Sequence, residues 1–233
     1  MIDIVATSFW TNPDLRYTSL ASARTGYTAE WVNRLKWGFK QHLPGNWKFV
    51  CLTNETDGFD GDVERIPFEG PPGWWNITQL MSPEITKGRM MFCGLDTVVV
   101  GDLGGIAALD HPFMLPNPVA NRFNNGFCVW RQRAVRSLWD AYREWGVEPD
   151  PVEVPWRVAG KPSEMLFWIR TFGRPNIGRL GVDLAPHQVV SYKLQYRKKP
   201  GFYRRKARVV YFQGRLTPHL LMGEKWPNDV SSS

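Results

Sequence analysis

Asp96, an acid between two apolar runs, is the residue of this sequence best placed to do chemistry. It follows the apolar run Arg89 to Cys93 and precedes the β-branched run Thr97 to Val100. A carboxylate fixed at the end of a buried strand is a common ligand for a divalent cation that also binds phosphate groups. The same position suits an aspartate that only forms the turn between two strands. Asp96 is therefore a candidate metal ligand, with the turn as the alternative.

Two asparagines and a glycine form a second group with chemical potential. Asn124, Asn125 and Gly126 precede the apolar run that ends at Trp130. Amide side chains offer both hydrogen-bond donors and acceptors to ligand hydroxyl groups, and glycine lets a ligand approach the main chain. A tight turn into the strand would explain the same residues.

The elements that must position these residues alternate in type. Ile2 to Ala6 is a short β-rich run that ends in the polar pair Thr7-Ser8, and Lys48 to Leu52 is a second apolar strand. Between them, Thr28 opens a predicted helix that ends at Pro44-Gly45. A strand, a helix and a strand in this order predict a doubly wound sheet, and such sheets bind ligands at the carboxyl ends of their strands.

The rest of the chain continues the alternation without an internal repeat or a linker, so we expect a single domain over residues 1–233. Residues 148–162 contain four prolines and predict a long surface loop. The other predicted elements are a helix to about Met81 after the turn 70–73, strands at 89–93, 97–100, 126–130, 188–192 and 209–213, and helices at 133–145 and 163–172.

The net charge indicates which classes of partner the protein favours, and the positions of the cysteines indicate their redox state. With 29 Lys and Arg against 22 Asp and Glu, the net charge of +7 favours anionic partners. Residues 197–208 hold seven basic residues and two aromatics, a pattern that suits nucleic acid, an anionic membrane surface or a solvated loop. Cys51, Cys93 and Cys128 lie far apart in apolar runs and are predicted to be buried, reduced thiols.

The N-terminus, the composition and the tryptophans support expectations about localisation, origin and the exposure of side chains. Asp3 stands where a signal peptide needs a basic flank, and no apolar run approaches a membrane span, so a soluble, cytoplasmic protein is expected. A composition rich in Trp and Arg is similar to that of phage proteins and favours a phage or bacterial origin. Helical spacing places Trp31, Trp139 and Trp145 in the core, whereas Trp74, Trp75 and Trp156 are expected to be exposed candidates for packing on sugar rings.

The segment Gly94-Leu-Asp96-Thr-Val-Val-Val-Gly-Asp102-Leu103 resembles the region around the Asp-x-Asp motif of GT-A glycosyltransferases similar to family 8, the galactosyltransferase and glycogenin-like group. Further matches follow in the family's order, and the resemblance spans roughly residues 2 to 220. These matches are Tyr27 to Leu43, Phe49 to Thr53, Gly73 to Trp75, Phe123 to Phe127, Val190 to Lys193 and Tyr211 to Gly214.

The resemblance implies an α/β protein of the GT-A type, with a Rossmann-like mixed sheet flanked by helices. It also implies transfer of a sugar from a nucleotide-sugar donor, a UDP-sugar, with retention and with Mn²⁺ or Mg²⁺. Glu164 would lie near the reacting carbon and stabilise positive charge or act as a nucleophile, although Ser163 and Glu164 also suit a helix start. The implied sites are catalytic Glu164 and Asn125; donor-binding Thr7, Asp96, Asn124, Gly126, Lys193 and Gly214; and the metal ligand Asp96.

The departures from the family pattern concern the metal. Gly94 replaces the first acid, Tyr211 aligns with the late metal-binding histidine, and the usual basic residue falls near Ile77 or Thr78. Basic side chains such as Lys193 and those of residues 197–199 are candidates to neutralise a leaving phosphate instead.

Two alternatives therefore remain open beside the transferase. One is a catalytically silent nucleotide- or sugar-binding module. The other is a DNA-modifying transferase that uses the basic segment, and the acceptor is in any case a protein, a glycan or DNA.

Overall fold

Strands and helices alternate along the first half of the chain, as the apolar spacing predicts. The structure is a computed structural model and describes residues 1–11, 16, 27–116, 123–158 and 160–212. The elements of this half are β1 (Ile4–Ser8), α2 (Ala29–His42), β2 (Lys48–Leu52), β3 (Val63–Ile66), the 3₁₀ helix η1 (Trp75–Met81), β4 (Arg89–Cys93), β5 (Thr97–Val99), α3 (Gly104–Ala108) and β6 (Phe113–Leu115).

The second half of the chain has mostly shorter strands and several further helices. Its elements are β7 (Phe127–Arg131), α4 (Arg136–Trp145), β8 (Arg157–Val158), β9 (Lys161–Pro162), α5 (Glu164–Phe172), η2 (Arg174–Asn176), β10 (Gly178–Arg179), the π-helical turn η3 (Leu180–Leu184), β11 (Val189–Ser191), η4 (Tyr196–Lys198), α6 (Pro200–Lys206) and β12 (Val209–Tyr211).

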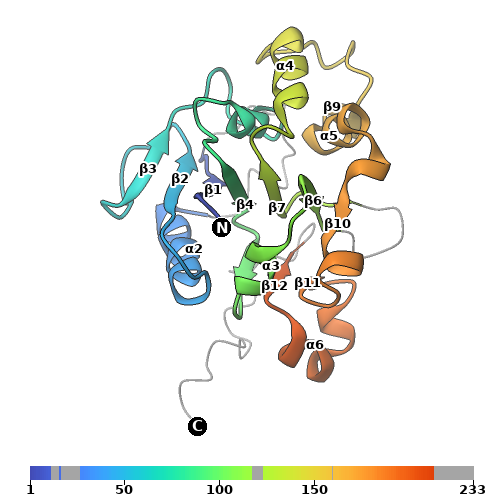
Figure 1. Cartoon of the computed structure of the whole chain (residues 1–233). Coiled ribbons are helices and arrows are strands. Elements are labelled where there is room, and N and C mark those ends of the chain that lie inside the picture. Colours follow the sequence, from blue (N-terminus) through green and yellow to red (C-terminus); the bar gives the residue numbers. More distant parts are fainter. Residues whose placement is uncertain (12–15, 17–26, 117–122, 159, 213–233) are drawn as a thin grey trace.

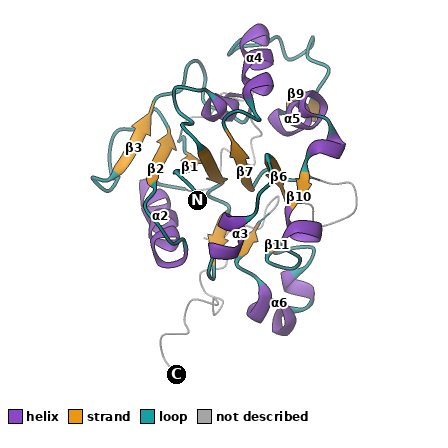
Figure 2. Cartoon of the chain, viewed as in Figure 1, coloured by secondary structure: helices purple, strands orange, loops and turns teal. Residues whose placement is uncertain are grey.

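Seven strands form the central sheet, in the order β10-β6-β7-β4-β1-β2-β3 (Figure 1). The strands β4, β1, β2 and β3 run parallel, whereas β7 is antiparallel to both β4 and β6. The sheet is therefore mixed, and helices flank it on both faces (Figure 2). This confirms the predicted α/β fold class with a mixed sheet.

Apolar side chains cover both faces of the sheet because successive residues of a buried strand point to opposite sides. Val5 and Met91 belong to the cluster that contains the buried face of α2, and Ala6 and Phe92 belong to the cluster that contains η1, α4 and α5. Helix α2 follows Thr28, as predicted, and packs through Val32, Leu35 and Phe39.

A second, three-stranded sheet follows the order β11-β12-β5. Strand β12 is parallel to β11 and antiparallel to β5, which places Tyr211 opposite Thr97. One face contributes Val99 and Val209 to the cluster of α2, and the other packs against α6. Strand β5 leads the chain away from Asp96. Because β12 is antiparallel to β5, it returns the chain to the carboxyl end of β4.

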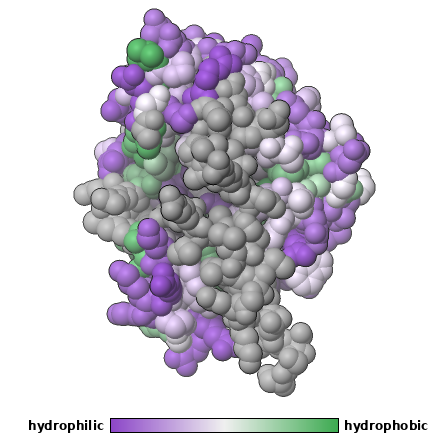
Figure 3. All heavy atoms as spheres, turned by 180° about the vertical axis from the view of Figure 1, so that it is seen from behind, coloured by the Kyte–Doolittle hydropathy of each residue, from purple (hydrophilic) through white to green (hydrophobic). Residues whose placement is uncertain are grey.

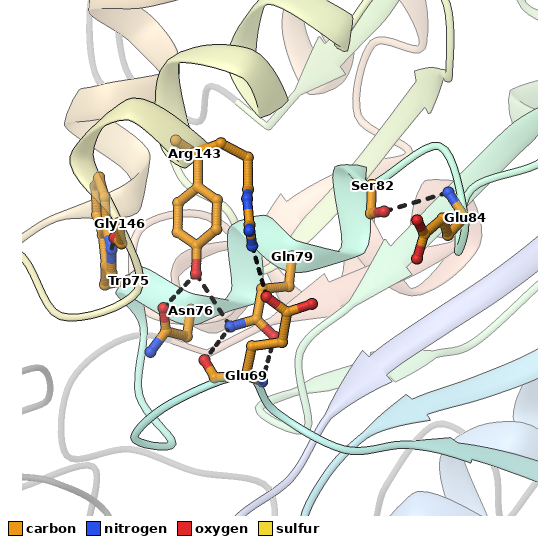
Figure 4. A network of polar contacts seen from close by, with 9 residues as sticks. Glu69, Trp75, Asn76, Gln79, Ser82, Glu84, Arg143 and Gly146 are labelled. Carbon is orange, nitrogen blue, oxygen red and sulfur yellow. Dashed lines mark hydrogen bonds and ion pairs between the residues drawn. The ribbon is translucent and has the colours of Figure 1, made fainter.

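A buried polar network joins η1 to α4 (Figure 4). The hydroxyl of Tyr142 donates a hydrogen bond to Oδ1 of Asn76 at 2.5 Å and accepts one from Nε2 of Gln79 at 3.0 Å. Gln79 also binds the main chain of Glu69 through both ends of its amide, at 2.6 and 2.9 Å. The polar groups at the centre of this network are therefore paired with one another.

Several expectations about surface and core are wrong. Trp75 and Trp156 are buried and their rings stack at 6.2 Å, while Trp145 is 38% exposed and Trp31 and Trp139 are only partly buried. Packing between distant segments, which helical spacing does not report, decides these exposures.

The predicted loop at 148–162 and the basic run, for which a solvated loop was one alternative, both contain regular structure. Residues 148–162 contain the hairpin of β8 and β9 and the buried Val154, and the basic run 197–208 contains η4 and α6. The first strand begins at Ile4 instead of Ile2, whereas the strands at 48–52 and 89–93 have the predicted bounds.

The described residues on the face seen from behind are largely hydrophilic (Figure 3). Purple side chains predominate where described atoms are visible from behind (Figure 3). None of the helices in this part of the chain has the length and apolar content that crossing a bilayer requires. The three cysteines are buried and free, as predicted.

Candidate functional site

Asp96 lies just past the carboxyl end of β4, where the chain turns into β5. Its main-chain oxygen accepts a hydrogen bond from the nitrogen of Phe212 at 2.8 Å. Oγ1 of Thr97 donates to the oxygen of Gly126 at 2.9 Å and lies 3.5 Å from Oδ1 of Asp96. Two other segments of the chain, those of Phe212 and Gly126, therefore hold Asp96 and its neighbour Thr97 in place.

Gly94, which replaces the first acid of the family that the sequence resembles, lies against the carboxylate of Asp96. A β-carbon added to Gly94 would lie 2.8 Å from Oδ1 of Asp96, so an acidic side chain there would have to displace this carboxylate. The nitrogen of Gly94 donates to the oxygen of Gly126 at 2.9 Å, which ties the end of β4 to the start of β7. The carboxylate of Asp96 lies against the space that a longer residue 94 would use.

The segment before β7 forms the turn that its composition allows, and it also contacts Glu164. Oδ1 of Asn124 accepts a hydrogen bond from the nitrogen of Gly126 at 2.7 Å, which forms the expected turn. Nδ2 of Asn125 donates to Oε1 of Glu164, and its main-chain oxygen accepts from Sγ of Cys128 at 3.3 Å. Gly126 has no room for a side chain, because a β-carbon there would lie 2.9 Å from Oδ1 of Asn124.

Glu164 begins α5, and Ser163 caps this helix by accepting a hydrogen bond from the nitrogen of Leu166 at 3.4 Å. The sequence pattern for a helix start is thus confirmed. A first-turn acid that only offsets the helix dipole is usually exposed, however, and Glu164 is only 4% exposed and is paired with Asn125. The fold brings this carboxylate, the amide of Asn125 and, through Gly126, the carboxylate of Asp96 into one region.

Both carboxyl groups of this region have raised pKa values. Desolvation raises the pKa of Glu164 to about 7, against the opposing effect of its main-chain and Asn125 hydrogen bonds. Desolvation likewise raises the pKa of Asp96 to about 7, although this residue keeps partial exposure to solvent. The negative charge of Asp96 adds to burial in raising the pKa of the hydroxyls of Tyr27 and Tyr211.

Two buried hydroxyl groups near Asp96 have no hydrogen-bond partner among the described residues. They are Oγ1 of Thr7, near the carboxyl end of β1, and the hydroxyl of Tyr211, at the end of β12. A buried polar group without a partner costs stability, so a native protein usually supplies one. The other unpaired side-chain atoms of this kind are indole nitrogens of Trp130 and Trp156 and Nε of Arg89.

A bound metal would have few protein ligands here. No group of three His, Cys, Asp or Glu side chains that could hold a metal exists among the residues that the structure describes. Tyr211, not a histidine, lies beside Asp96, and Ile77 and Thr78 are buried in η1. The described part of the chain thus offers one carboxylate at this position.

Lys193 lies at the same end of the small sheet as Asp96. It follows β11, whose last residue, Ser191, is level with Tyr211 and through it with Thr97. The side chain of Lys193 is exposed. Its position beside the site agrees with a donor contact, but no interaction joins it to Asp96.

The remaining expected donor contacts are less well placed. Arg197, Lys198 and Lys199 are exposed on and after η4, and Gly214 lies outside the described residues. Two surface cavities of about 480 and 300 Å³ include neither Asp96 nor Glu164. Phe123, which precedes the asparagine pair in the sequence, is one of the residues that line the smaller cavity.

Sequence reasoning found the two acids and the asparagines but missed three of their neighbours. Thr97, Tyr27 and Cys128 each interact with a site residue. Thr97 had a signal, because it directly follows the candidate acid. Tyr27 had none, since only the folded chain brings it to Asp96, whereas Cys128 lies three residues after Asn125 and reaches it within the turn into β7.

Solved structures of glycosyltransferases share this arrangement of strands and helices. The bifunctional glycosyltransferase WbbM aligns with 93% of this chain at a TM-score of 0.60 and 12% identity, and GlyE of Streptococcus pneumoniae TIGR4 with 94% at 0.60 and 11%. A glycosyltransferase involved in glycosylation of the major capsid of PBCV-1 aligns with 91% at 0.53 and 9%, over 93% of its own length.

This chain spans 46% of WbbM and 56% of GlyE. No family model and no curated protein matches the sequence. The chain therefore has a glycosyltransferase fold of the GT-A-like kind.

Proposed function

We propose that this protein is a glycosyltransferase that moves a sugar from a nucleotide-sugar donor to an acceptor. The observation that carries the proposal is the convergence of Asp96, Asn125 and Glu164 at the carboxyl end of the central sheet, where α/β folds bind ligands. The glycosyltransferase fold supports the same assignment.

The donor in this proposal is a UDP-sugar that lies across the ends of β1, β4 and β7. The unpaired hydroxyls of Thr7 and Tyr211 are placed to pair with its polar groups. Asn124 uses its oxygen in the turn, which leaves its amide nitrogen to donate to a sugar hydroxyl. Lys193 supplies positive charge at the rim for the phosphates.

A divalent cation fits this site when the donor shares it. Mg²⁺ commonly binds through one or two carboxylates together with substrate phosphates, and Asp96 is the one carboxylate that this edge offers. Bound there, Mn²⁺ or Mg²⁺ would neutralise the charge that develops on the departing diphosphate. We therefore propose that Asp96 binds the cation only together with the nucleotide.

In the transfer, the bond between the anomeric carbon and the phosphate oxygen breaks, and its electron pair stays on the phosphate. The acceptor oxygen forms the new bond to this carbon, and its proton passes to the departing diphosphate, which carries the electron pair of the broken bond. Ionised Glu164, held by Asn125, stabilises the positive charge that develops on the sugar. We propose that the configuration at the anomeric carbon is retained.

The experiment measures release of nucleotide and transfer of sugar with a panel of nucleotide sugars, with and without Mn²⁺. We expect turnover of a UDP-sugar, and we expect Mn²⁺ to raise the melting temperature only when UDP is present, because ligands stabilise the state that binds them. If every donor is inert while UDP still binds, the protein is a silent binding module and the proposal fails.

The acceptor is then sought by mass spectrometry of protein, glycan and DNA fractions from the native host. A mass increase of one sugar on a single fraction identifies its class. Transfer to water alone in every fraction would contradict a transferase that needs an acceptor.

A further inference from the structure

A second charged surface lies on η4 and α6. The sequence has no Asp or Glu between Asp183 and Glu224. Within this stretch, six basic side chains are exposed in a span of ten residues. They are Arg197, Lys198, Lys199, Arg204, Arg205 and Lys206.

None of these six side chains forms an ion pair with a carboxylate in the described part of the chain. On α2, by contrast, Arg34 pairs with Glu30 at 2.5 Å and Lys40 with Asp62 at 3.3 Å. Like charges that lie close together repel one another, and this repulsion lowers the stability of the folded state. An anionic partner would remove that cost, whereas a merely solvated helix would gain from interspersed acids.

The fold fixes the direction in which this surface faces. Tyr196, Tyr203 and Ala207 are buried in a cluster with Val190 and Val210 of the small sheet. The apolar side of α6 is therefore used inside the protein. The cations remain on the outer side of a helix that cannot rotate without losing this packing.

The composition of the outer side distinguishes between anionic partners. A helix that lies in a membrane interface needs a broad apolar face, and α6 has no such face to spare. The one large exposed apolar residue on it is Phe202, which is 38% exposed and lies 4.4 Å from Nζ of Lys206. Cations around a single aromatic ring suit a phosphate backbone and a stacked base.

We propose that the surface formed by η4 and α6 binds nucleic acid through its phosphate backbone, with Phe202 in contact with a base of single strands. Seven residues of α6 span about 10 Å, which corresponds to about three phosphates of one strand. The proposal does not depend on sugar transfer, because its partner is recognised by charge, and among the described residues no interaction joins Arg204, Arg205 or Lys206 to Asp96 or Glu164.

The experiment measures binding of the full chain to labelled DNA and RNA of about 20 nucleotides, single- and double-stranded, by fluorescence anisotropy from about 50 to about 300 mM salt. We expect log K to fall with log salt with a slope of about −3. The triple variant R204Q/R205Q/K206Q should bind at least about tenfold more weakly and have a shallower slope. The control K48Q/K87Q/R133Q removes the same net charge from other exposed sites and should change affinity less than about twofold.

Three outcomes would overturn the proposal. They are no binding at the lowest salt, an equal loss in the two triple variants, and binding to phosphatidylserine vesicles without binding to nucleic acid. Thermal unfolding of each variant shows whether it is folded, and the K198Q/K199Q variant repeats the test on the segment that precedes α6. F202A should weaken binding to single strands more than to duplexes, and an equal effect would overturn the contact with a base.

Discussion

Two fully buried tyrosines show how differently this protein treats its polar groups. The hydroxyl of Tyr142 both donates and accepts a hydrogen bond in the network between η1 and α4, whereas the hydroxyl of Tyr211 beside Asp96 has no partner among the described residues. Both rings are 0% exposed, so burial alone does not explain the contrast. A satisfied network stabilises the fold, and an unsatisfied one leaves donors and acceptors for a ligand.

The carboxyl groups extend this comparison. Asp96 and Glu164 have pKa values raised by desolvation to about 7, while Asp62, which pairs with Lys36 and Lys40 at the surface, has its pKa lowered to about 2. Ion pairing favours the charged form, and burial without a cation disfavours it. The region of Asp96 therefore gives up stability where the proposed chemistry needs reactive groups.

The largest effect should follow the change of Asp96→Asn. It removes the negative charge but keeps the size of the side chain, so we expect kcat/KM for transfer to fall by about 10²–10³-fold, as when one electrostatic stabiliser is lost. Stability at neutral pH should not fall, because a desolvated carboxylate is replaced by a neutral amide. Donor turnover and thermal unfolding measure the two effects.

Asp102→Asn is the matched control for this change. Asp102 follows β5 and accepts a hydrogen bond from the nitrogen of Gly104 at 2.9 Å. It should retain nearly full activity. Equal activity losses in the two variants would contradict the assignment of Asp96.

A change in the network between η1 and α4 should lower the stability of the protein and leave its catalytic activity unchanged. Tyr142→Phe leaves Oδ1 of Asn76 and Nε2 of Gln79 each without one partner, so we expect a loss of about 1–3 kcal/mol in the free energy of unfolding. Urea denaturation measures this loss, and kcat/KM of the folded variant should match that of the wild type. A stable Tyr142→Phe protein would show that this network does not hold η1 against α4.

A pH dependence should separate Glu164 from exposed acids. Its pKa is raised, so between about pH 4.5 and about pH 7 the folded state keeps a proton that the unfolded state has lost. Stability from this group therefore falls as pH rises through that window, by about 3 kcal/mol, and Glu164→Gln should remove this contribution while that of Asp96 remains.

Urea denaturation at about pH 5 and about pH 8 checks this expectation. Glu153→Gln changes an exposed acid and should leave the wild-type dependence unchanged. If the wild type and Glu164→Gln have parallel pH profiles, Glu164 does not carry the effect.

The smallest effect on stability should come from Tyr211→Phe, the direct counterpart of Tyr142→Phe. Its hydroxyl has no hydrogen bond to lose, so the free energy of unfolding without donor should stay within about 0.5 kcal/mol of the wild type. Binding of the nucleotide sugar, measured by calorimetry, should weaken several-fold. A stability loss as large as that of Tyr142→Phe would mean that Tyr211 is structural.

Local sequence patterns were enough to predict the helices and strands that contain long apolar runs. The strands 48–52 and 89–93 and the helix after Thr28 are confirmed because their side-chain spacing is set within the segment itself. Strands β3, β6 and β10 were missed, since they are only four, three and two residues long and owe their pairing to neighbouring strands. Trp75 and Trp156 were misplaced at the surface because each buries the other from a distant segment.

The sequence by itself determined that an acid ends an apolar strand at Asp96, that amides precede another strand, and that a glutamate starts a helix behind Ser163. These features are local, so residue type and spacing suffice to find them. Only the tertiary structure decided that Asn125 contacts Glu164, that Asp96 lies over Gly94, and that the hydroxyl of Tyr211 has no hydrogen-bond partner within the described part of the chain. Contacts and desolvation of this kind depend on segments that are far apart in the chain and meet only when the sheet forms.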